Sequence, residues 1–151
     1  MDENPLLSTN LVDKHIVKMP LESAQILCTV AQLKGFSAPY KITHQKHPVT
    51  NWVAKSSANW NWLCEHGLAL SKEYTYRYKK IHKCESIIHF MKDKTLDIFK
   101  DNIDYTNHTP FVLCMPDQYK VESAVQSYRN YYRGDKAYIA KWTGRETPEW
   151  W

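Results

Sequence analysis

An imidazole, an ammonium group and a carboxylate stand in one row near the start of the chain, at His15, Lys18 and Glu22. Steps of three and four residues keep side chains on one face of a helix. A carboxylate held beside an imidazole can move protons and stabilise a developing positive charge. The spacing therefore leaves two interpretations open: a catalytic site on a helix edge, or a simple salt bridge between Lys18 and Glu22.

An apolar seam beside this row predicts the helix that positions it. The seam consists of Val12, Ile16, Met19, Ile26 and Val30. Its one gap is Ser23. We expect a helix that begins after a cap within residues 8–10, runs to about Lys34 and kinks at Pro20, because proline removes one helical hydrogen bond. The seam would face the core and hold Glu22 at its edge, fixed by packing yet open to a ligand.

Further helical segments follow. A second helix is expected from Pro48 to about Lys79, with Trp60 and Leu63 in the core. A shorter helix is expected over 84–99, and a third long one over 115–132, capped near Asp117. The predicted fold class is all-α: residues 1–151 form one compact domain, a bundle of about three long helices plus shorter ones. Irregular loops connect them, and the aromatic tail at 144–151 is irregular too.

Composition narrows the class of protein. No apolar run reaches roughly 18 residues, so no membrane span or membrane partner is expected. The acidic start, "MDENPLLSTN", lacks a signal-peptide core, which predicts a cytoplasmic protein (in the host cytoplasm if the source is viral) that is not secreted. The four cysteines lie 36, 20 and 30 residues apart, which favours free thiols. His82, Cys84 and His89 do not share one helical face, so no metal site and no cofactor are expected.

The net charge of +4 is modest, but its distribution points to nucleic acid. "YTYRYKKIHK" (74–83) and "YRNYYRGDKAYIAKW" (128–142) interleave cations with aromatic rings, a pattern that suits phosphate neutralisation and stacking. The alternative is a solvated helix face whose tyrosines lean into the core, and His47 has the alternative of capping the second helix. The predicted contacts to duplex DNA are Lys14, Lys18, His47, Arg77, Arg129, Tyr131, Tyr132, Lys136 and Lys141.

Three blocks of sequence carry a family resemblance: "LVDKHIVKMPLESAQIL", "HPVTNWVAKSSANWNWLCEHGLALSKEYTYRY" and "YRNYYRGDKAYIAKW". The first resembles the first helix of the pyrimidine-dimer DNA glycosylases of the bacteriophage endonuclease V type, in which an Asp-x-His precedes a catalytic glutamate. The second is similar to that family's His-led second helix, and the third to its aromatic, basic carboxyl-terminal segment. The blocks keep the family's order and cover somewhat under half of the chain.

The resemblance implies a compact helical DNA repair enzyme that needs no metal. In such enzymes a free main-chain amine attacks C1′ of the damaged nucleotide and displaces the base, and the resulting Schiff base permits strand cleavage by β-elimination. Carried over to this chain, Glu22 matches the catalytic glutamate, with His15 and Asp13 as the preceding pair. Met1 stands where the family's mature amino terminus lies, so its amine is the expected nucleophile.

The residue types suit this chemistry. An α-amine titrates at about 7.7–8.0, against about 10.4 for lysine, so more of it is uncharged near neutral pH. Leu21 and Gln25 stand where the family has arginines, which favours a damaged or modified pyrimidine, rather than the dimer alone, as substrate. One alternative is a catalytically inactive helical protein of phage or viral origin that binds nucleic acid or a nucleotide. Another is a partner-binding protein whose "PEWW" tail fills a partner's pocket or covers its own core.

Overall fold

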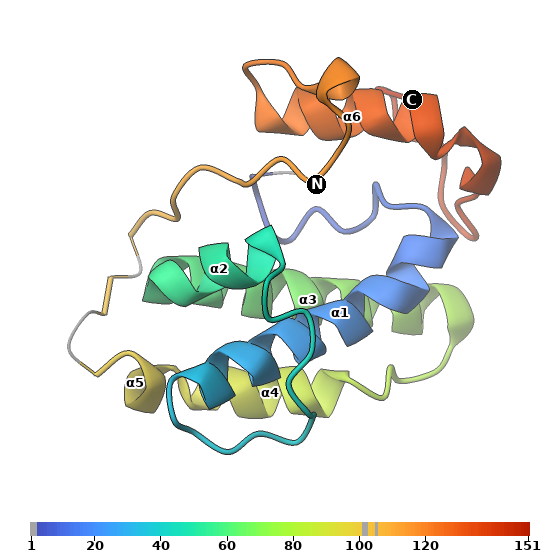
Figure 1. The fold of residues 1–151 in the computed structure, drawn as a ribbon. Helices are drawn as coiled ribbons and strands as arrows, with labels where there is room; N and C mark the ends of the chain where they lie inside the picture. The colour runs from blue at the N-terminus through green and yellow to red at the C-terminus, as the bar shows by residue number, and fades with distance from the viewer. Residues whose placement is uncertain (1–2, 101–102, 105) are drawn as a thin grey trace.

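The computed structural model describes residues 3–100, 103–104 and 106–151, and every regular element in this part of the chain is a helix. The expected all-α fold is therefore confirmed (Figure 1). The α-helices are α1 (Asp13–Leu33), α2 (Pro48–Lys55), α3 (Ser57–Tyr78), α4 (Glu85–Asp93), α5 (Thr95–Ile98) and α6 (Ala124–Asp135). Two 3₁₀ turns, η1 (Asp117–Tyr119) and η2 (Ala137–Ile139), flank α6.

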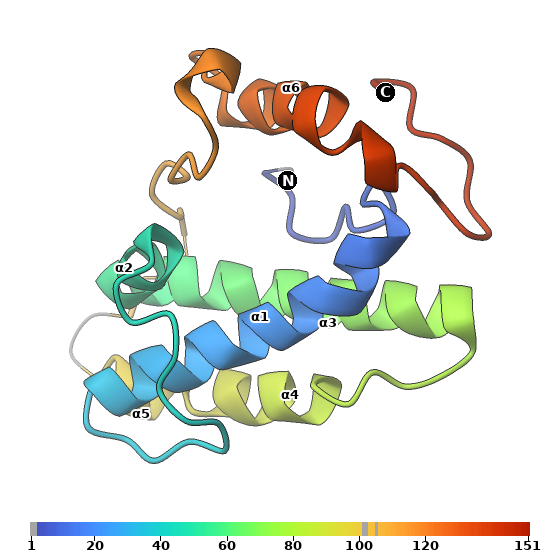
Figure 2. The same cartoon turned by 45° about the vertical axis from the view of Figure 1, so that its right-hand side comes forward.

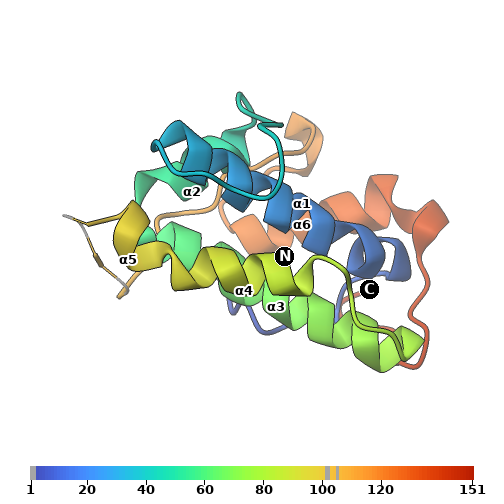
Figure 3. The same cartoon turned by 90° about the horizontal axis from the view of Figure 1, so that it is seen from below.

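The helices form two tiers. Helices α1, α2, α3 and α4 pack against one another in the lower tier, where α1 crosses α3 and α4 (Figures 2 and 3). Helix α6 lies across the top, and the N-terminal segment runs between the tiers (Figure 2). Hydrogen bonds hold this segment on both sides: Ser8 Oγ donates to the carbonyl of Ala69 in α3, and Trp142 Nε1 donates to the carbonyl of Asn10.

Helix α1 buries its apolar seam as expected. Val12, Ile16 and Val30 are fully buried, and Ile26 nearly so. The helix begins later than predicted, after Val12, which supplies no side-chain cap, and it continues through Pro20. The main core lies between α1, α2, α3 and α4 and includes Trp60 and Leu63, at the predicted core positions, together with Trp52, Trp62, Leu27 and Ile88.

The predicted second helix is two helices. Ser56 interrupts it with an extended backbone (φ −152°, ψ 155°), and its side chain accepts a hydrogen bond from the amide of Asn59. A serine in this conformation is a good N-cap, because its oxygen satisfies one of the free amides at the start of a helix. The break separates α2 from α3 and turns α2 across the end of the bundle (Figure 1).

The segment expected to form one helix over 115–132 also divides, into η1 and α6, with Ser123 rather than Asp117 capping α6. Helix α6 continues past Gly134 to Asp135. It joins the N-terminal segment through a second apolar cluster formed by Leu11, Val12, Ile16, Leu70, Tyr132 and Ile139. Trp150 and Trp151 pack against this cluster. The tail therefore covers the protein's own core, as one of the two readings of "PEWW" predicted.

Arg77 joins α3 to α1 and to the N-terminal segment. Its guanidinium donates to Asp13 Oδ1 (2.9 Å), Glu73 Oε1 (2.7 Å) and the carbonyl of Thr9 (2.9 Å). The Arg77 side chain has 0% exposed surface, so the expectation that it contacts DNA is corrected: no phosphate can reach it. Arg145, from the tail, closes the network with two hydrogen bonds to Glu73. We refer to Asp13, Glu73, Arg77 and Arg145 as the buried ion network.

The four cysteine side chains differ in how deeply they are buried. Cys28, Cys64 and Cys84 are buried and Cys114 is half-buried, and all four thiols are free, as expected. Burial raises the pKa of the Cys28 thiol, which makes it a weak nucleophile.

None of the helices in the described part of the chain combines the length and apolar content that crossing a bilayer requires.

Candidate active site

Glu22 lies on the edge of α1 that faces α6, with its side chain 32% exposed. Its carboxylate is 3.0 Å from Lys18 Nζ, one turn earlier, so the salt bridge predicted as the alternative is present. His15 lies on the same face of the helix, two turns before Glu22. Packing along the seam thus fixes the carboxylate while leaving part of it open, the arrangement that acid–base work requires.

His15 is a neutral imidazole held against α6. Burial lowers its pKa to about 4, with a further contribution from the Lys136 ammonium group, although the Glu22 carboxylate acts in the opposite direction. Its Nδ1 shares a hydrogen bond with the hydroxyl of Tyr132, and the two rings meet edge to face. Tyr132 is only 6% exposed. The expectation that Tyr132 stacks on DNA is therefore corrected, because its ring belongs to the second cluster and its hydroxyl orients His15.

A small cavity opens beside Glu22, between α1, α2, α3 and α6. It has a volume of about 110 Å³. We refer to it as the Glu22 cavity. Its walls are mainly aromatic and aliphatic, and the lining residues with a carboxylate, hydroxyl or imidazole group include Glu22, Ser23, His47 and His66. The remaining lining residues are Met19, Ile26, Val49, Trp52, Trp62, Leu63, Phe111, Val112 and Tyr128.

His47 stands at the open side of this cavity. Its Nδ1 accepts a hydrogen bond from the amide of Val49 (3.2 Å), so the predicted capping of the helix at Pro48 is confirmed. The ring is otherwise exposed, which leaves Nε2 available to a ligand at the mouth of the cavity.

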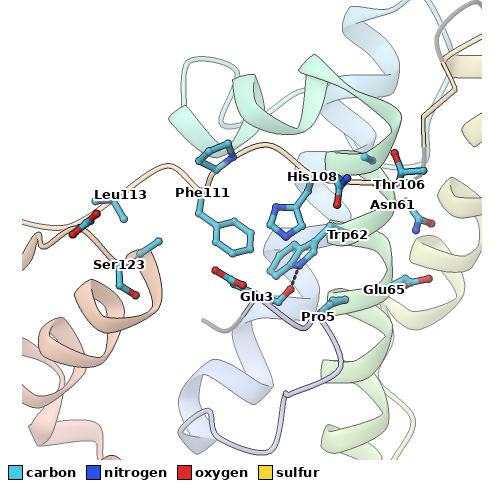
Figure 4. A pocket seen from close by; sticks show the side chains of 15 residues that line it. Glu3, Pro5, Asn61, Trp62, Glu65, Thr106, His108, Phe111, Leu113 and Ser123 are labelled. Atoms are coloured by element: carbon cyan, nitrogen blue, oxygen red, sulfur yellow. Dashed lines mark hydrogen bonds between the residues drawn. The ribbon is translucent and has the colours of Figure 1, made fainter.

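The N-terminal segment is fastened to the wall of the Glu22 cavity. Trp62 Nε1 donates a hydrogen bond to the carbonyl of Glu3 (2.9 Å), drawn in Figure 4, and His66 Nδ1 donates one to the carbonyl of Pro5 (3.0 Å). Both Trp62 and His66 line the cavity. Met1, the expected nucleophile, lies outside the described residues.

Three of the predicted DNA contacts come together. Lys14, Lys18 and Lys141 line one open groove of about 490 Å³ on the N-terminal half of α1. Asp13 also lines it, but its carboxylate is occupied by Arg77 and Thr143. Hydrogen bonds from Thr143 and Arg77 hold the pKa of Asp13 below its usual value, although burial, the largest single influence, acts the other way. We refer to Lys14, Lys18 and Lys141 as the basic groove.

The other residues predicted to contact DNA, on α6 or directly after it, lie against neighbouring aromatic rings. The guanidinium of Arg129 lies 5.4 Å from the Trp150 ring centroid, and Lys136 Nζ lies 5.0 Å from that of Tyr131. Lys136 is also close enough to His15 to lower its pKa. Lys136 therefore lies near the Glu22 edge of α1, whereas Arg129 and Tyr131 support the tail and the η1 turn.

A larger, more open cleft lies on the other side of Trp62 and Phe111, between the N-terminal segment, α3 and the loop before α6 (Figure 4). Its volume is about 710 Å³. The cleft carries the carboxylates of Glu3, Glu65 and Glu122 and no lysine or arginine among its described lining residues. Such a surface repels a phosphate backbone, so size alone does not make it the nucleic-acid site.

Sequence reasoning did not identify Ser23, His66 and the aromatic walls as site residues. Ser23 was visible as the gap in the apolar seam, and that gap is where the cavity lies. His66 interrupts the buried face of α3 between Leu63 and Leu70. An unexplained polar residue in an apolar stripe was thus the available sign in both cases.

Comparisons of the chain with models of protein families, with characterised proteins and with solved structures returned no match. Within the described residues, no group of three or more histidine, cysteine, aspartate or glutamate side chains could hold a metal ion. The chemistry of the site must therefore be argued from its own residues.

Proposed function

We propose that this protein is a DNA glycosylase with abasic-site lyase activity, which removes a damaged or modified pyrimidine from duplex DNA. The nucleophile is the α-amino group of Met1, and Glu22 is the catalytic carboxylate. The observation that carries the proposal is the position of Glu22, which lies between an aromatic cavity of about 110 Å³ and a groove of three lysines.

The fastening of the N-terminal segment supports the choice of nucleophile. The carbonyl of Glu3 is bound to Trp62, which shares the cavity with Glu22. The α-amino group is two residues before Glu3, and two residues of chain span at most about 7 Å. The proposal requires the amine to extend from this tether past Trp62 to Glu22.

The reaction follows from these groups. The uncharged amine attacks C1′, the bond from C1′ to the base breaks, and the base departs with a proton. Of the two amine protons, one leaves with the base and the other passes through Glu22 to O4′ as the sugar ring opens and a C1′ imine forms. Loss of a C2′ proton then expels the 3′ phosphate, and water hydrolyses the imine to restore the amine. His15, whose pKa burial lowers to about 4, stays neutral near pH 7 and adds no positive charge beside Glu22.

Reductive trapping tests the proposal. We expect the protein to become covalently joined to duplex DNA containing an abasic site when borohydride is present, because borohydride reduces the imine. Glu22→Gln should slow adduct formation by about 100-fold or more, as loss of one such group does in other active sites.

The matched control is Glu65→Gln. Glu65 is also partly exposed, at 37%, and also pairs with a lysine, Lys92, at 3.4 Å. The Glu65→Gln variant should trap DNA at the same rate as the wild-type protein. Equal loss in both variants, or no adduct with the wild-type protein, would contradict the enzymatic proposal; DNA binding without trapping would favour an inactive binding protein.

The basic groove predicts the salt dependence of DNA binding. Lys14→Ala and Lys141→Ala should each weaken binding to duplex DNA of any sequence, and each should reduce the slope of log affinity against log salt by about 1, because one phosphate contact is lost. Lys100→Ala, an exposed lysine after α5, serves as the control. Slopes that do not differ between these variants and wild type would mean that DNA binds elsewhere.

A further inference from the structure

We propose that the Glu22 cavity binds a single pyrimidine base of the thymine or uracil type, recognised by the N–H of its ring nitrogen N3. This inference rests on the function proposed above and names the base that the enzyme would accept. The extruded base would enter the cavity while its sugar stays at the mouth, beside Glu22. The size, walls and polar atoms of the cavity each support this ligand.

The size admits at most one six-membered ring. The cavity measures about 110 Å³, less than the cavities of about 150 Å³ that accept benzene, so a pyrimidine would enter it only in part, from the open side. A purine, with two fused rings, needs more room than this. The walls suit a flat ring, because Trp52, Trp62 and Phe111 contact one another there, with ring centroids 4.9–5.9 Å apart. Aromatic side chains are the usual partners of an unstacked base.

His66 supplies a hydrogen-bond acceptor. Its Nδ1 faces the carbonyl of Pro5, which can only accept, so Nδ1 carries the proton. Burial lowers the pKa of His66 to about 4, so the ring is neutral near pH 7 and Nε2 keeps a lone pair. Nε2 has no hydrogen-bond partner among the described residues, although His66 is only 8% exposed. Because Nε2 is not fully enclosed, a ligand that brings a hydrogen-bond donor can reach it.

Ser23 supplies a second unoccupied group. The side chain is 4% exposed, and its hydroxyl makes no hydrogen bond within the described part of the chain. No described side-chain nitrogen or oxygen is both fully enclosed and unpartnered. Ser23 Oγ and His66 Nε2 therefore reach accessible space, and the Glu22 cavity is the space that both residues line. In thymine and uracil the N3–H lies between two carbonyl oxygens. The N3–H can donate to His66 Nε2, and a carbonyl oxygen can accept from the Ser23 hydroxyl.

Titration with free bases, followed by ¹H–¹⁵N spectra of the full chain, tests the proposal. We expect 1-methylthymine to shift the indole N–H signals of Trp52 and Trp62 but not that of Trp142, which lies beside the second cluster. 1,3-Dimethylthymine, which lacks the N3–H, should bind at least tenfold more weakly, and 9-methyladenine should not shift these signals. Equal binding of the two thymines, binding of the adenine, or no shift with 1-methylthymine would overturn the proposal.

Two variants locate the site. Val112→Phe should fill the cavity and abolish the shifts, whereas Leu113→Phe, whose side chain lines the open cleft instead, should preserve them. Loss in both variants or in neither would place the base elsewhere. Trapping on abasic DNA needs no base, so it remains intact if only the base site fails. Base binding, in turn, remains intact if the lyase chemistry fails.

Discussion

Arg77→Ala should destabilise the protein by roughly 3 kcal/mol, because it removes the only cation paired with the Asp13 carboxylate among the described residues and leaves Glu73 paired with Arg145 alone. The Arg77 side chain is fully buried, and Glu73 and Asp13 beside it are 4% and 13% exposed. Losing the guanidinium also frees the carbonyl of Thr9, which anchors the segment between the tiers. The measurement is the free energy of unfolding by urea at pH 7.

Arg133→Ala is the matched control for this prediction. Arg133 is an exposed arginine on α6 that bonds only to Asn130 and the carbonyl of Trp150. Its loss should cost less than about 1 kcal/mol, as for other surface contacts. A similar small cost for Arg77→Ala would show that the buried ion network does not hold α1, α3 and the N-terminal segment together.

Acidification from about pH 6.5 toward pH 4 should destabilise the protein through its buried histidines. Burial lowers the pKa of His66, and of His15, to about 4 from about 6.5. Between these pH values the unfolded chain binds more protons than the folded one, so stability is complete above pH 6.5 and is lost as pH falls toward 4. Each pH unit of this window is worth about 1.4 kcal/mol, which gives about 3 kcal/mol for His66.

Urea unfolding at several values between pH 7 and pH 4 measures this effect. His66→Gln should flatten the dependence by about 3 kcal/mol over that range, and His15→Gln should flatten it less, because His15 is only partly buried. An unchanged slope in the His66 variant would contradict the assignment of a neutral, buried imidazole. Below this window a second loss is expected, because hydrogen bonds lower the pKa of Asp13 and Glu73 despite their burial.

The elements built on apolar spacing were predictable, whereas the breaks between them were not. Val12 and Ile16 follow a helical period that is visible in the sequence, and both are fully buried. Ser56 interrupts a stretch whose apolar period runs on without a gap, so only its backbone geometry reveals the cap. Local caps compete with helix continuation on differences of about 1 kcal/mol, which spacing alone does not resolve.

The candidate site was predictable on α1 and, away from α1, at His47 and Lys141. His15, Lys18 and Glu22 share one face because helix geometry requires it. Arg77 was misassigned because its burial depends on Asp13, 64 residues away, and on Arg145 from the tail. The Glu22 cavity draws its walls from four helices and a loop, a convergence that no local pattern encodes.

Mapping the trapped adduct tests the central proposal most directly. The wild-type protein would be joined to abasic DNA with borohydride and digested, and the modified peptide would be sequenced by mass spectrometry. We predict that the reduced deoxyribose is attached to the α-amino nitrogen of Met1. An adduct on the ε-amino group of Lys14 or Lys18, or an amino terminus that begins upstream of Met1 in the natural protein, would contradict it.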